Sequence, residues 1–349
     1  MSDFSDNVLN WFARHGRKDL PWQQELSPYV VWISEIMLQQ TQVVTVIPFF
    51  NRFMATFPNV KALANADIDL VLHHWTGLGY YARGRNLHKA AKAIVNDYDG
   101  NLPVNVEQLC QLPGIGKSTA GAIAAIAYKQ QAAILDGNVK RVLTRFHGIA
   151  GWPEHSAVKA RLWQLDESLT PEIKVAQYTQ AMMDLGATVC TRTKPGCDRC
   201  PLSEKCVAHH TDSIDQYPGR RPKKILPVKQ VAMYMLQNKR NEVLLQKRPP
   251  TGIWGGLWSF PEADCPSEEP ALLDDSIEVE SSSKWPEVRH TFSHYHLDIT
   301  PVHNKVRCQK NTIMDSGRWL WYPLDKPLEV GLAAPVKKLL RQLAQQPGN

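Results

Sequence analysis

The sequence predicts a mainly α-helical N-terminal domain, residues 1–216, followed by a smaller α+β domain, residues 231–349. Two observations indicate this division. The first part has long stretches in which apolar residues recur at helical spacing, and few in which apolar and polar residues alternate. Between the two parts, residues 217–230 contain three prolines, five Lys or Arg residues and no acid, which is typical of a basic, semi-rigid linker.

Length and composition indicate an ordinary globular protein. The 349 residues are enough for two domains, and 43% of them are hydrophobic while 21% are charged. No apolar run is long enough to cross a membrane, and the acidic, amphipathic N-terminus MSDFSDNVLNWFARHG lacks the layout of a signal peptide. We therefore expect a cytoplasmic protein without a membrane partner.

The net charge of +6 comes almost wholly from the linker, because acids and bases nearly balance on both sides of it. Net charge alone argues only weakly for a nucleic-acid partner. A local cluster argues better, since four basic residues fall within one expected helix: Arg83, Arg85, Lys89 and Lys92. Such a face can bind phosphates or can simply be solvated, and the sequence leaves both interpretations open.

Helical periodicity predicts most of the first domain. The stretch 28–50 is apolar on most sides, which is typical of a buried helix. The other predicted helices are amphipathic. They span residues 6–14, 59–76, 83–98, 163–169 and 175–189.

A glycine turn, Leu112-Pro113-Gly114-Ile115-Gly116, precedes a run of Ala, Ile and Gly at 118–128 that predicts a buried helix. Glycine allows positive φ and close backbone approach, so this turn can join two helices and present bare N–H groups to a phosphate. Glycine turns are also common as plain connectors. Asp136 follows at an expected helix start, where it is either a cap or a functional carboxylate.

The second domain shows strand patterns instead. Residues 231–236 and 242–248 flank the turn Asn238-Lys239-Arg240-Asn241 and predict a β-hairpin. A closing helix is expected at 335–343, with proline near its first turn. Further strands are expected at 257–261, 288–300 and 318–322.

Four of the seven cysteines crowd into one segment with the spacing C-x6-C-x2-C-x5-C: Cys190, Cys197, Cys200 and Cys206. An odd total with one tight cluster favours a metal site in a reducing compartment over a disulfide framework. Zinc ribbons usually separate two knuckles by about 15–20 residues. One loop that supplies all four thiolates suits an iron–sulfur cubane, with a structural zinc as the alternative.

Two carboxylates have the environments that glycosidic bond cleavage requires. Glu35 lies in a strongly apolar helical stretch, where desolvation raises its pKa toward that of a general acid, although a salt-bridged structural role is equally open. One acid must protonate the leaving group, and one anion must stabilise or bond to the oxocarbenium-like sugar. Glu35 and Asp136 fit that division.

Longer motifs then resemble a known family, the helix-hairpin-helix DNA glycosylases with an iron–sulfur cluster, and within it the adenine DNA glycosylases (the MutY family). The resemblance extends over nearly the whole chain, and its motifs are SEIMLQQTQ at 34–42, GLGYYAR at 77–83 and LDGNVKR at 135–141. It implies a monomer that removes undamaged adenine mispaired with 8-oxoguanine or guanine in duplex DNA. It also implies one [4Fe-4S] cluster on the four cysteines, with Glu35 as the acid and Asp136 as the residue that stabilises the sugar cation.

The same resemblance suggests roles for residues around the site. Gln42 and Tyr80 match positions that wedge into the duplex, although a surface glutamine and a core tyrosine would look the same. Gly114 and Gly116 match the phosphate-gripping hairpin. Where lyases of the endonuclease III type carry a nucleophilic lysine, this chain has Ser118, so water is the expected nucleophile and the enzyme is monofunctional.

Lys140 is the nearest amine to the expected sugar site in the sequence. It could form an adventitious adduct with the abasic product. As an i,i+4 neighbour, it could equally pair with Asp136. The sequence leaves both open.

The second domain resembles a Nudix fold, since TGIWGGLWSFP at 251–261 is similar to the segment that enters the Nudix box of 8-oxo-dGTP hydrolases. The following residues 271–275 lack the box glutamates, which implies a binding module rather than a hydrolase. The resemblance assigns recognition of 8-oxoguanine to a loop with Phe292, Ser293 and His294. A metal site formed by His290, His294 and His296 is the alternative.

Two further functions remain open at this point. One is a bifunctional glycosylase/AP lyase of the endonuclease III type, which Ser118 argues against. The other is a non-enzymatic iron–sulfur DNA-binding sensor, which the pair Glu35 and Asp136 argues against.

Overall fold

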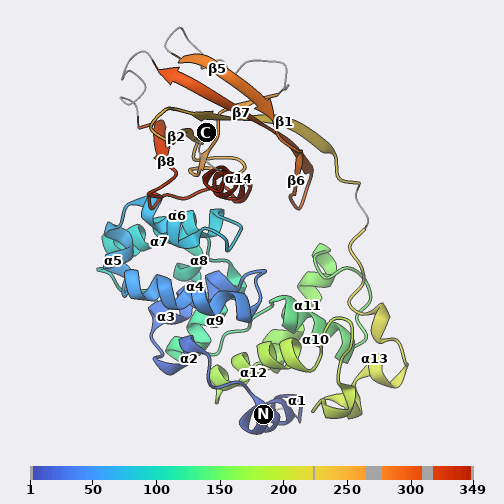
Figure 1. Ribbon diagram of the computed structural model, residues 1–349. Coiled ribbons are helices and arrows are strands. Elements are labelled where there is room, and N and C mark those ends of the chain that lie inside the picture. The colour runs from blue at the N-terminus through green and yellow to red at the C-terminus, as the bar shows by residue number, and fades with distance from the viewer. Residues whose placement is uncertain (1–2, 223–224, 265–276, 309–316, 347–349) are drawn as a thin grey trace. The chain divides into compact units, whose positions relative to one another are not determined.

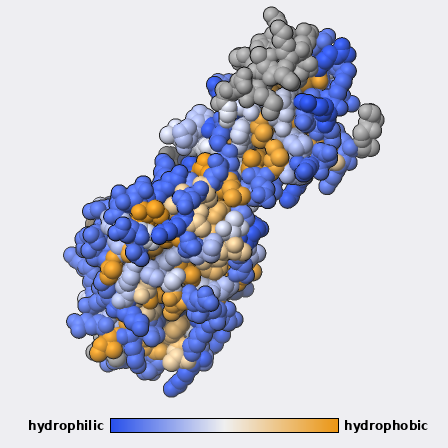
Figure 2. Space-filling view, turned by 90° about the vertical axis from the view of Figure 1, so that its left-hand side faces the viewer, coloured by the Kyte–Doolittle hydropathy of each residue, from blue (hydrophilic) through white to orange (hydrophobic). Residues whose placement is uncertain are grey.

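The computed structural model describes residues 3–222, 225–264, 277–308 and 317–346. The chain divides into two compact units, Met1–Asn65 with Asn86–Lys223 and Ala66–Arg85 with Lys224–Asn349. The first unit is helical and the second combines a sheet with helices, which confirms the predicted fold class. Within the described ranges, no helix is both long and apolar enough to span a bilayer. Polar residues cover most of the face shown in Figure 2.

The helical unit consists of α-helices joined by short connections (Figure 1). The helices predicted at 6–14, 83–98, 163–169 and 175–189 are confirmed, some of them longer than expected. The bounds are α1 Asp3–His15, α2 Pro21–Gln24, α3 Pro28–Leu38, α4 Val43–Thr56, α5 Val60–Asn65, α7 Ala82–Asp97, α8 Val106–Gln111, α9 Lys117–Tyr128, α10 Gly137–Phe146, α11 Ser156–Leu169, α12 Val175–Thr188 and α13 Val207–His210.

Two predicted helices are each interrupted, so their predicted extent was wrong. The stretch 28–50 is broken between α3 and α4, where Gln40 adopts a left-handed φ of 56°. The stretch 59–76 is broken between α5 and α6 (Ile68–Trp75), because the Asp67 side chain accepts a hydrogen bond from the Asp69 N–H and caps a new helix. Helical spacing continued across both breaks, so periodicity alone did not reveal them.

The predicted glycine hairpin joins α8 to α9, and α9 is buried along most of its length. Small residues allow close packing there. A Cβ at Gly121 would lie only 2.2 Å from the carbonyl oxygen of Ala133, so α9 contacts the backbone that leads to Asp136. The helix after that backbone, α10, packs against α12, where a Cβ at Gly186 would lie 2.4 Å from Asn138. Glycines on two helices thus hold the Asp136 region tightly.

The second unit is built on one mixed sheet, with the order β3-β2-β1-β7-β5 and further strands paired to its members. Strands β1 and β7 are parallel over ten residue pairs, and the other pairings are antiparallel. The strands are β1 Val228–Gln237, β2 Glu242–Lys247, β3 Trp258–Ser259, β4 Glu262–Ala263, β5 Ile277–Lys284, β6 Val288–Thr291, β7 His296–Cys308 and β8 Trp319–Pro323.

Most strand predictions in this unit are confirmed, and one is corrected. The hairpin of β1 and β2 and the closing helix α14 (Ala334–Ala344) form as expected. The predicted strand 288–300 is in fact two antiparallel strands, β6 and β7. The chain reverses between them, where the Phe292 N–H donates to the Tyr295 carbonyl at 2.9 Å.

Residues 66–85, which include α6, are grouped with the sheet although they precede the linker in sequence. Long-range contacts explain this grouping. Arg85 donates to the Gly255 carbonyl at 2.6 Å, and the Tyr81 hydroxyl donates to the Leu332 carbonyl at 3.2 Å. Asp69 pairs with Lys247 at 2.9 Å. The segment that carries Tyr80 is therefore anchored by residues of the C-terminal part of the chain.

Candidate active site

Glu35 lies in the middle of α3, a helix that is otherwise almost entirely buried. Ser27 caps this helix by accepting a hydrogen bond from the Val30 N–H at 3.2 Å, and Pro28 occupies its first turn. Six residues next to Glu35 in the sequence are buried, while Glu35 itself stays partly accessible. They are Trp32, Ile33, Ser34, Ile36, Met37 and Val31. The carboxyl group of Glu35 therefore projects from a mostly apolar helix.

Asp136 caps the N-terminus of α10, as its position in the sequence suggested. Its Oδ1 accepts a hydrogen bond from the Val139 N–H at 2.7 Å, and its Oδ2 accepts one from the Asn138 side chain at 3.0 Å. The carboxylate orientation is therefore fixed by the first turn of α10. Hydrogen bonds of this kind, at the positive end of a helix, favour the ionised form.

The electrostatics of the two acids differ in the way that catalysis requires. Burial and, to a smaller extent, the nearby charge of Asp136 raise the pKa of Glu35 to about 8. Burial also raises the pKa of Asp136, but the hydrogen bonds from Val139 and Asn138 and the charge of Arg141 oppose that rise. Glu35 therefore holds a proton at neutral pH beside a carboxylate whose contacts favour the anion.

Two side chains hold the backbone that leads to Asp136. The Leu135 N–H donates to Ser118 Oγ at 3.0 Å, and the Ile134 N–H donates to Asp166 Oδ2 at 2.9 Å. In the sequence, Ser118 stood out only because it replaces a lysine, and Asp166 did not stand out at all. A signal existed, because Asp166 lies four residues after Leu162 on α11, and both face the core.

The glycine hairpin has the geometry of a backbone turn that only glycine adopts easily. Gly114 has a φ of 82°, and a Cβ there would lie 2.8 Å from the Cβ of Asn86. Gly116 is exposed and precedes α9, and a Cβ at this position would meet no atom within 4 Å. Open backbone before a helix N-terminus can bind an anion, so the predicted phosphate-binding role of both glycines stays a prediction.

The two predicted wedge residues lie in different units. Gln42 precedes α4, is exposed, and makes no capping hydrogen bond with its side chain. Tyr80 is 55% exposed and has a left-handed φ of 49°, with the Arg83 guanidinium 5.6 Å from its ring centre. The exposure of Tyr80 argues against the core alternative. Their roles in DNA binding remain predictions.

Two predicted basic residues are already engaged within the chain. Arg83 donates to the carbonyls of Leu78 and Gly79, and Arg85 donates to that of Gly255. The helix face that could bind phosphates is therefore reduced to the exposed Lys89 and Lys92.

Lys140 does not pair with Asp136, so that alternative was wrong. Its Nζ contacts Glu154 Oε1, and Lys159 reaches the other oxygen of Glu154 at 3.3 Å. The neighbouring Arg141 instead connects the first turn of α10, which follows Asp136, to the segment that begins at Cys190. It donates to Asn138 Oδ1 at 2.9 Å, to the Cys190 carbonyl at 2.7 Å and to a further carbonyl on α12.

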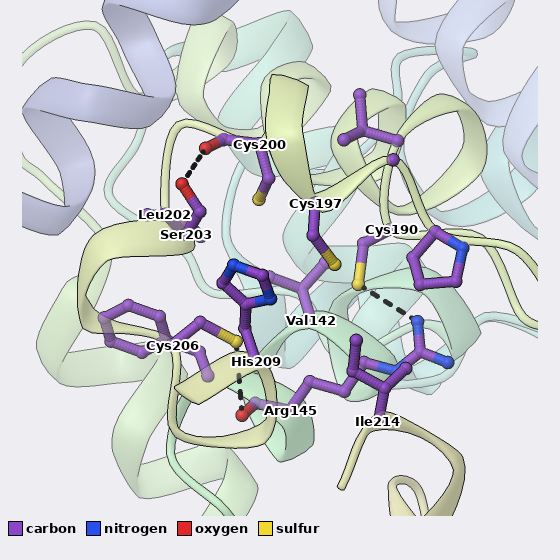
Figure 3. Close-up of a pocket in the computed structure, with 14 residues that line it drawn as sticks. Val142, Arg145, Cys190, Cys197, Cys200, Leu202, Ser203, Cys206, His209 and Ile214 are labelled. Atoms are coloured by element: carbon purple, nitrogen blue, oxygen red, sulfur yellow. Dashed lines mark hydrogen bonds between the residues drawn. The ribbon is translucent and has the colours of Figure 1, made fainter. Parts of the chain in front are cut away.

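The four clustered cysteines line one pocket, shown in Figure 3. No three described His, Cys, Asp or Glu side chains converge as ligands of a single metal ion. Four thiols that share one pocket are the donor set that an iron–sulfur cluster takes, and the cluster stays a prediction. All four thiols are free.

The charge environment of the cysteine pocket also favours a bound cation. Burial and the charges of the neighbouring cysteines together raise the pKa of Cys200 to about 12. Four thiolates therefore repel one another unless a metal group compensates their charge. One protein cation is already in place, since Arg145 is 3% exposed and donates to Cys190 Sγ at 3.4 Å. It also holds the carbonyls of Thr191 and Arg192.

The loop Phe292-Ser293-His294 joins β6 to β7. Phe292 packs among aromatic rings, with centroids 5.2 Å from Trp254 and 4.6 Å from His290. Ser293 and His294 are exposed. Since no described group of three histidines or acids can bind a metal ion, the alternative histidine site is not supported. Residues 271–275, where the Nudix glutamates would stand, lie outside the described residues.

Comparison with known proteins places this geometry among repair enzymes. Residues 33–167 match the HhH-GPD superfamily of base excision DNA repair proteins, and residues 232–342 match the NUDIX domain family. The chain is 40% identical over 340 residues to the adenine DNA glycosylase of Buchnera aphidicola from Acyrthosiphon pisum, covering 97% of this chain and 96% of the relative. It is 32% identical to the human adenine DNA glycosylase, covering 99% of this chain and 75% of the relative.

Solved structures resemble the helical part. A thermostable thymine-DNA glycosylase has a TM-score of 0.53 and 27% identity, with 60% of this chain and 95% of that chain covered. A trapped endonuclease III–DNA covalent intermediate has a TM-score of 0.52 at 18% identity, covering 61% of this chain and 99% of that chain, and indicates the fold alone.

Proposed function

Because this chain belongs to the adenine DNA glycosylase family, we propose that its substrate is adenine mispaired with 8-oxoguanine or guanine in duplex DNA. The target base lies inside the duplex, so the nucleotide must be flipped out before an acid can reach it. The glycine hairpin and the basic linker are the phosphate-binding elements of this proposal. Gln42 and Tyr80 would fill the space near the lesion.

The reaction we propose uses the two carboxyl groups in separate roles. Glu35 donates its proton to the adenine ring, which turns the base into a better leaving group. Asp136 stabilises the positive charge that develops on the sugar, or bonds to it, until water attacks. The single observation that carries the proposal is the pairing of a neutral Glu35, with a pKa of about 8, and a capped Asp136 close enough to raise it.

We propose that the enzyme is monofunctional. A lyase needs an amine at the sugar to form a Schiff base. Ser118 supplies no amine, and its hydroxyl is occupied by the Leu135 N–H. Lys140 is paired with Glu154, which opposes adduct formation.

One [4Fe-4S] cluster would be held by Cys190, Cys197, Cys200 and Cys206. The pocket that these four cysteines line together supports this proposal. When bound, such a cluster would cross-link the segment through its four thiolates. The hydrolysis needs only the two acids. Arg145 and Arg141 hold the segment from α10 through its backbone carbonyls.

The C-terminal unit is proposed as a recognition module for 8-oxoguanine rather than a hydrolase. Exposed Ser293 and His294 can form hydrogen bonds with a base. Phe292 packs against Trp254 and could stack on the base. A monomer suffices, because one chain supplies both the acids and the recognition loop. A DNA substrate and four thiols that need a reducing environment support a cytoplasmic, nucleoid-associated location.

One assay tests the proposal against its alternatives. Duplexes with A opposite 8-oxoguanine, A opposite guanine and A opposite T are incubated with the protein and then treated with alkali. The proposal expects breaks only after alkali, in the first two duplexes and not the third. Breaks before alkali would indicate the lyase. Duplex binding without an abasic site would indicate the non-enzymatic sensor.

A further inference from the structure

Asp166 is a buried acid that the two-carboxylate reaction does not use. It lies on α11, is 1% exposed, and accepts the Ile134 N–H at 2.9 Å. No salt bridge is described for it. Burying a carboxyl group without a neighbouring cation costs folding free energy. A specific hydrogen bond is therefore needed to offset this cost.

The chain that Asp166 contacts has no regular structure of its own. Residues 129–136 connect α9 to α10 without regular secondary structure, and Asp136 is the last of them. Backbone N–H groups of such a segment depend on side chains for hydrogen bonds. Two successive ones are held from different helices, Leu135 by Ser118 on α9 and Ile134 by Asp166 on α11.

This double attachment determines where α10 begins. The Asp136 side chain is fixed to the first turn of α10, and its backbone is fixed by the two residues before it. The Gly121 contact with Ala133 holds the next residue upstream. Loss of one attachment would let the carboxylate shift with its segment relative to Glu35 on α3.

The surroundings of Asp166 favour its neutral, protonated form, which can still accept a hydrogen bond. Burial, together with the charges of Asp136 and Glu167, raises its pKa to about 8 against the opposing effect of the Ile134 N–H. Tyr178, whose hydroxyl has no partner among the described residues, faces the same region. At neutral pH the carboxyl is protonated, so Asp136 has no second anion beside it.

We propose that Asp166 is a positioning residue that fixes the backbone of Ile134 to Asp136 and thereby holds the Asp136 carboxylate beside Glu35. The inference rests on the proposed role of Asp136. It concerns a residue that does not touch the substrate, so its effect appears in the chemical step and not in duplex binding.

The test compares an isosteric variant with one that lacks an acceptor. Asp166→Asn keeps an oxygen for the Ile134 N–H, and Asp166→Leu removes it. Single-turnover adenine release is measured on A opposite 8-oxoguanine, with the amplitude reporting the active fraction and the rate constant reporting the chemical step. Duplex Kd is measured alongside. Glu167→Leu is the matched control, an acid-to-leucine change at the next position, where the side chain is half exposed.

We expect Asp166→Asn and Glu167→Leu to keep rate constants within about 3-fold of wild type. Asp166→Leu is expected to lose about 10- to 100-fold in rate constant with nearly unchanged Kd, because a small displacement of a catalytic group costs up to about 100-fold. A wild-type rate constant for Asp166→Leu overturns the proposal. So does an Asp166→Asn variant as slow as Asp166→Leu.

If Asp166→Leu yields no folded enzyme, the test rests on Asp166→Asn. A single-turnover rate constant of Asp166→Asn more than about 10-fold below wild type overturns the proposal. Asp136→Asn separates this test from the proposed function. Full activity of Asp136→Asn would remove the role of Asp136, whatever the Asp166 variants show.

Discussion

The two acids that we propose as catalytic, Glu35 and Asp136, and the Phe292-Ser293-His294 loop are held in opposite ways. Asp136 is fixed by hydrogen bonds on its carboxylate and on the backbone before it, and Glu35 projects from a buried helix. The loop is anchored by ring packing of Phe292, while Ser293 and His294 point into solvent.

This difference matches two tasks. A proton donor and an anion must sit within a fraction of an ångström of their target, and directional hydrogen bonds with buried surroundings provide that precision. A recognition loop must adapt to a base that arrives, and exposed polar side chains on an aromatic anchor allow it. Substitutions should therefore affect rate in one region and discrimination in the other.

The largest effect is expected for Glu35→Gln. The amide has nearly the same shape but cannot donate the proton, so adenine release should fall by about 100- to 10,000-fold, the range that general acid catalysis contributes. Duplex binding should stay near wild type. The measurement is single-turnover release with Kd by titration. Turnover at the wild-type rate would show that Glu35 is not the acid.

The second prediction concerns the recognition loop. His294→Ala should reduce the preference for A opposite 8-oxoguanine over A opposite guanine by about 10-fold, the value of one good hydrogen bond to a base. The rate on A opposite guanine should hardly change. Leu328→Ala, another exposed residue of the same unit, is the control. Equal losses on both duplexes would argue against a discriminating role.

The sequence predicted these sites unequally. Glu35 and Asp136 could be found because an acid in an apolar helix and an acid at a helix start are local signals. Asp166 was missed, because its one local signal, the spacing of four residues from Leu162, is weak. A single acid in an amphipathic helix resembles a solvated residue, and its contact Ile134 lies 32 positions away in the sequence.

Local signals also failed for parts of the fold. The break after α3 depends on Gln40 at a positive φ, a conformation that glutamine rarely adopts and that composition does not reveal. The grouping of residues 66–85 with the sheet depends on contacts such as Arg85 to Gly255, which no periodicity encodes.

The third prediction uses the pH dependence of stability. Asp166 has its folded pKa raised to about 8, against about 3.9 when unfolded, so between these values the native state binds more protons than the unfolded state. Stability therefore falls as pH rises from about 4 to 8 and is flat above. Asp166→Asn removes this cost.

Thermal melting across pH is the measurement for this third prediction. The melting temperature of Asp166→Asn minus that of wild type should be near zero at about pH 4 and should grow to roughly 10 °C at about pH 8. An offset that is constant over this range would mean that Asp166 titrates normally in the folded protein.

The smallest effect is expected for Lys140→Gln. Lys140 pairs with a half-exposed Glu154, and such pairs contribute about 0–1 kcal/mol. The melting temperature should therefore change by no more than about 2 °C, and single-turnover adenine release should stay within about 2-fold of wild type. Borohydride trapping of the abasic product, with Lys117→Gln as the matched lysine control, checks for an adduct. A large loss of the release rate would indicate that Lys140 acts at the sugar. Precise positioning would then extend beyond Glu35 and Asp136 to this neighbouring lysine.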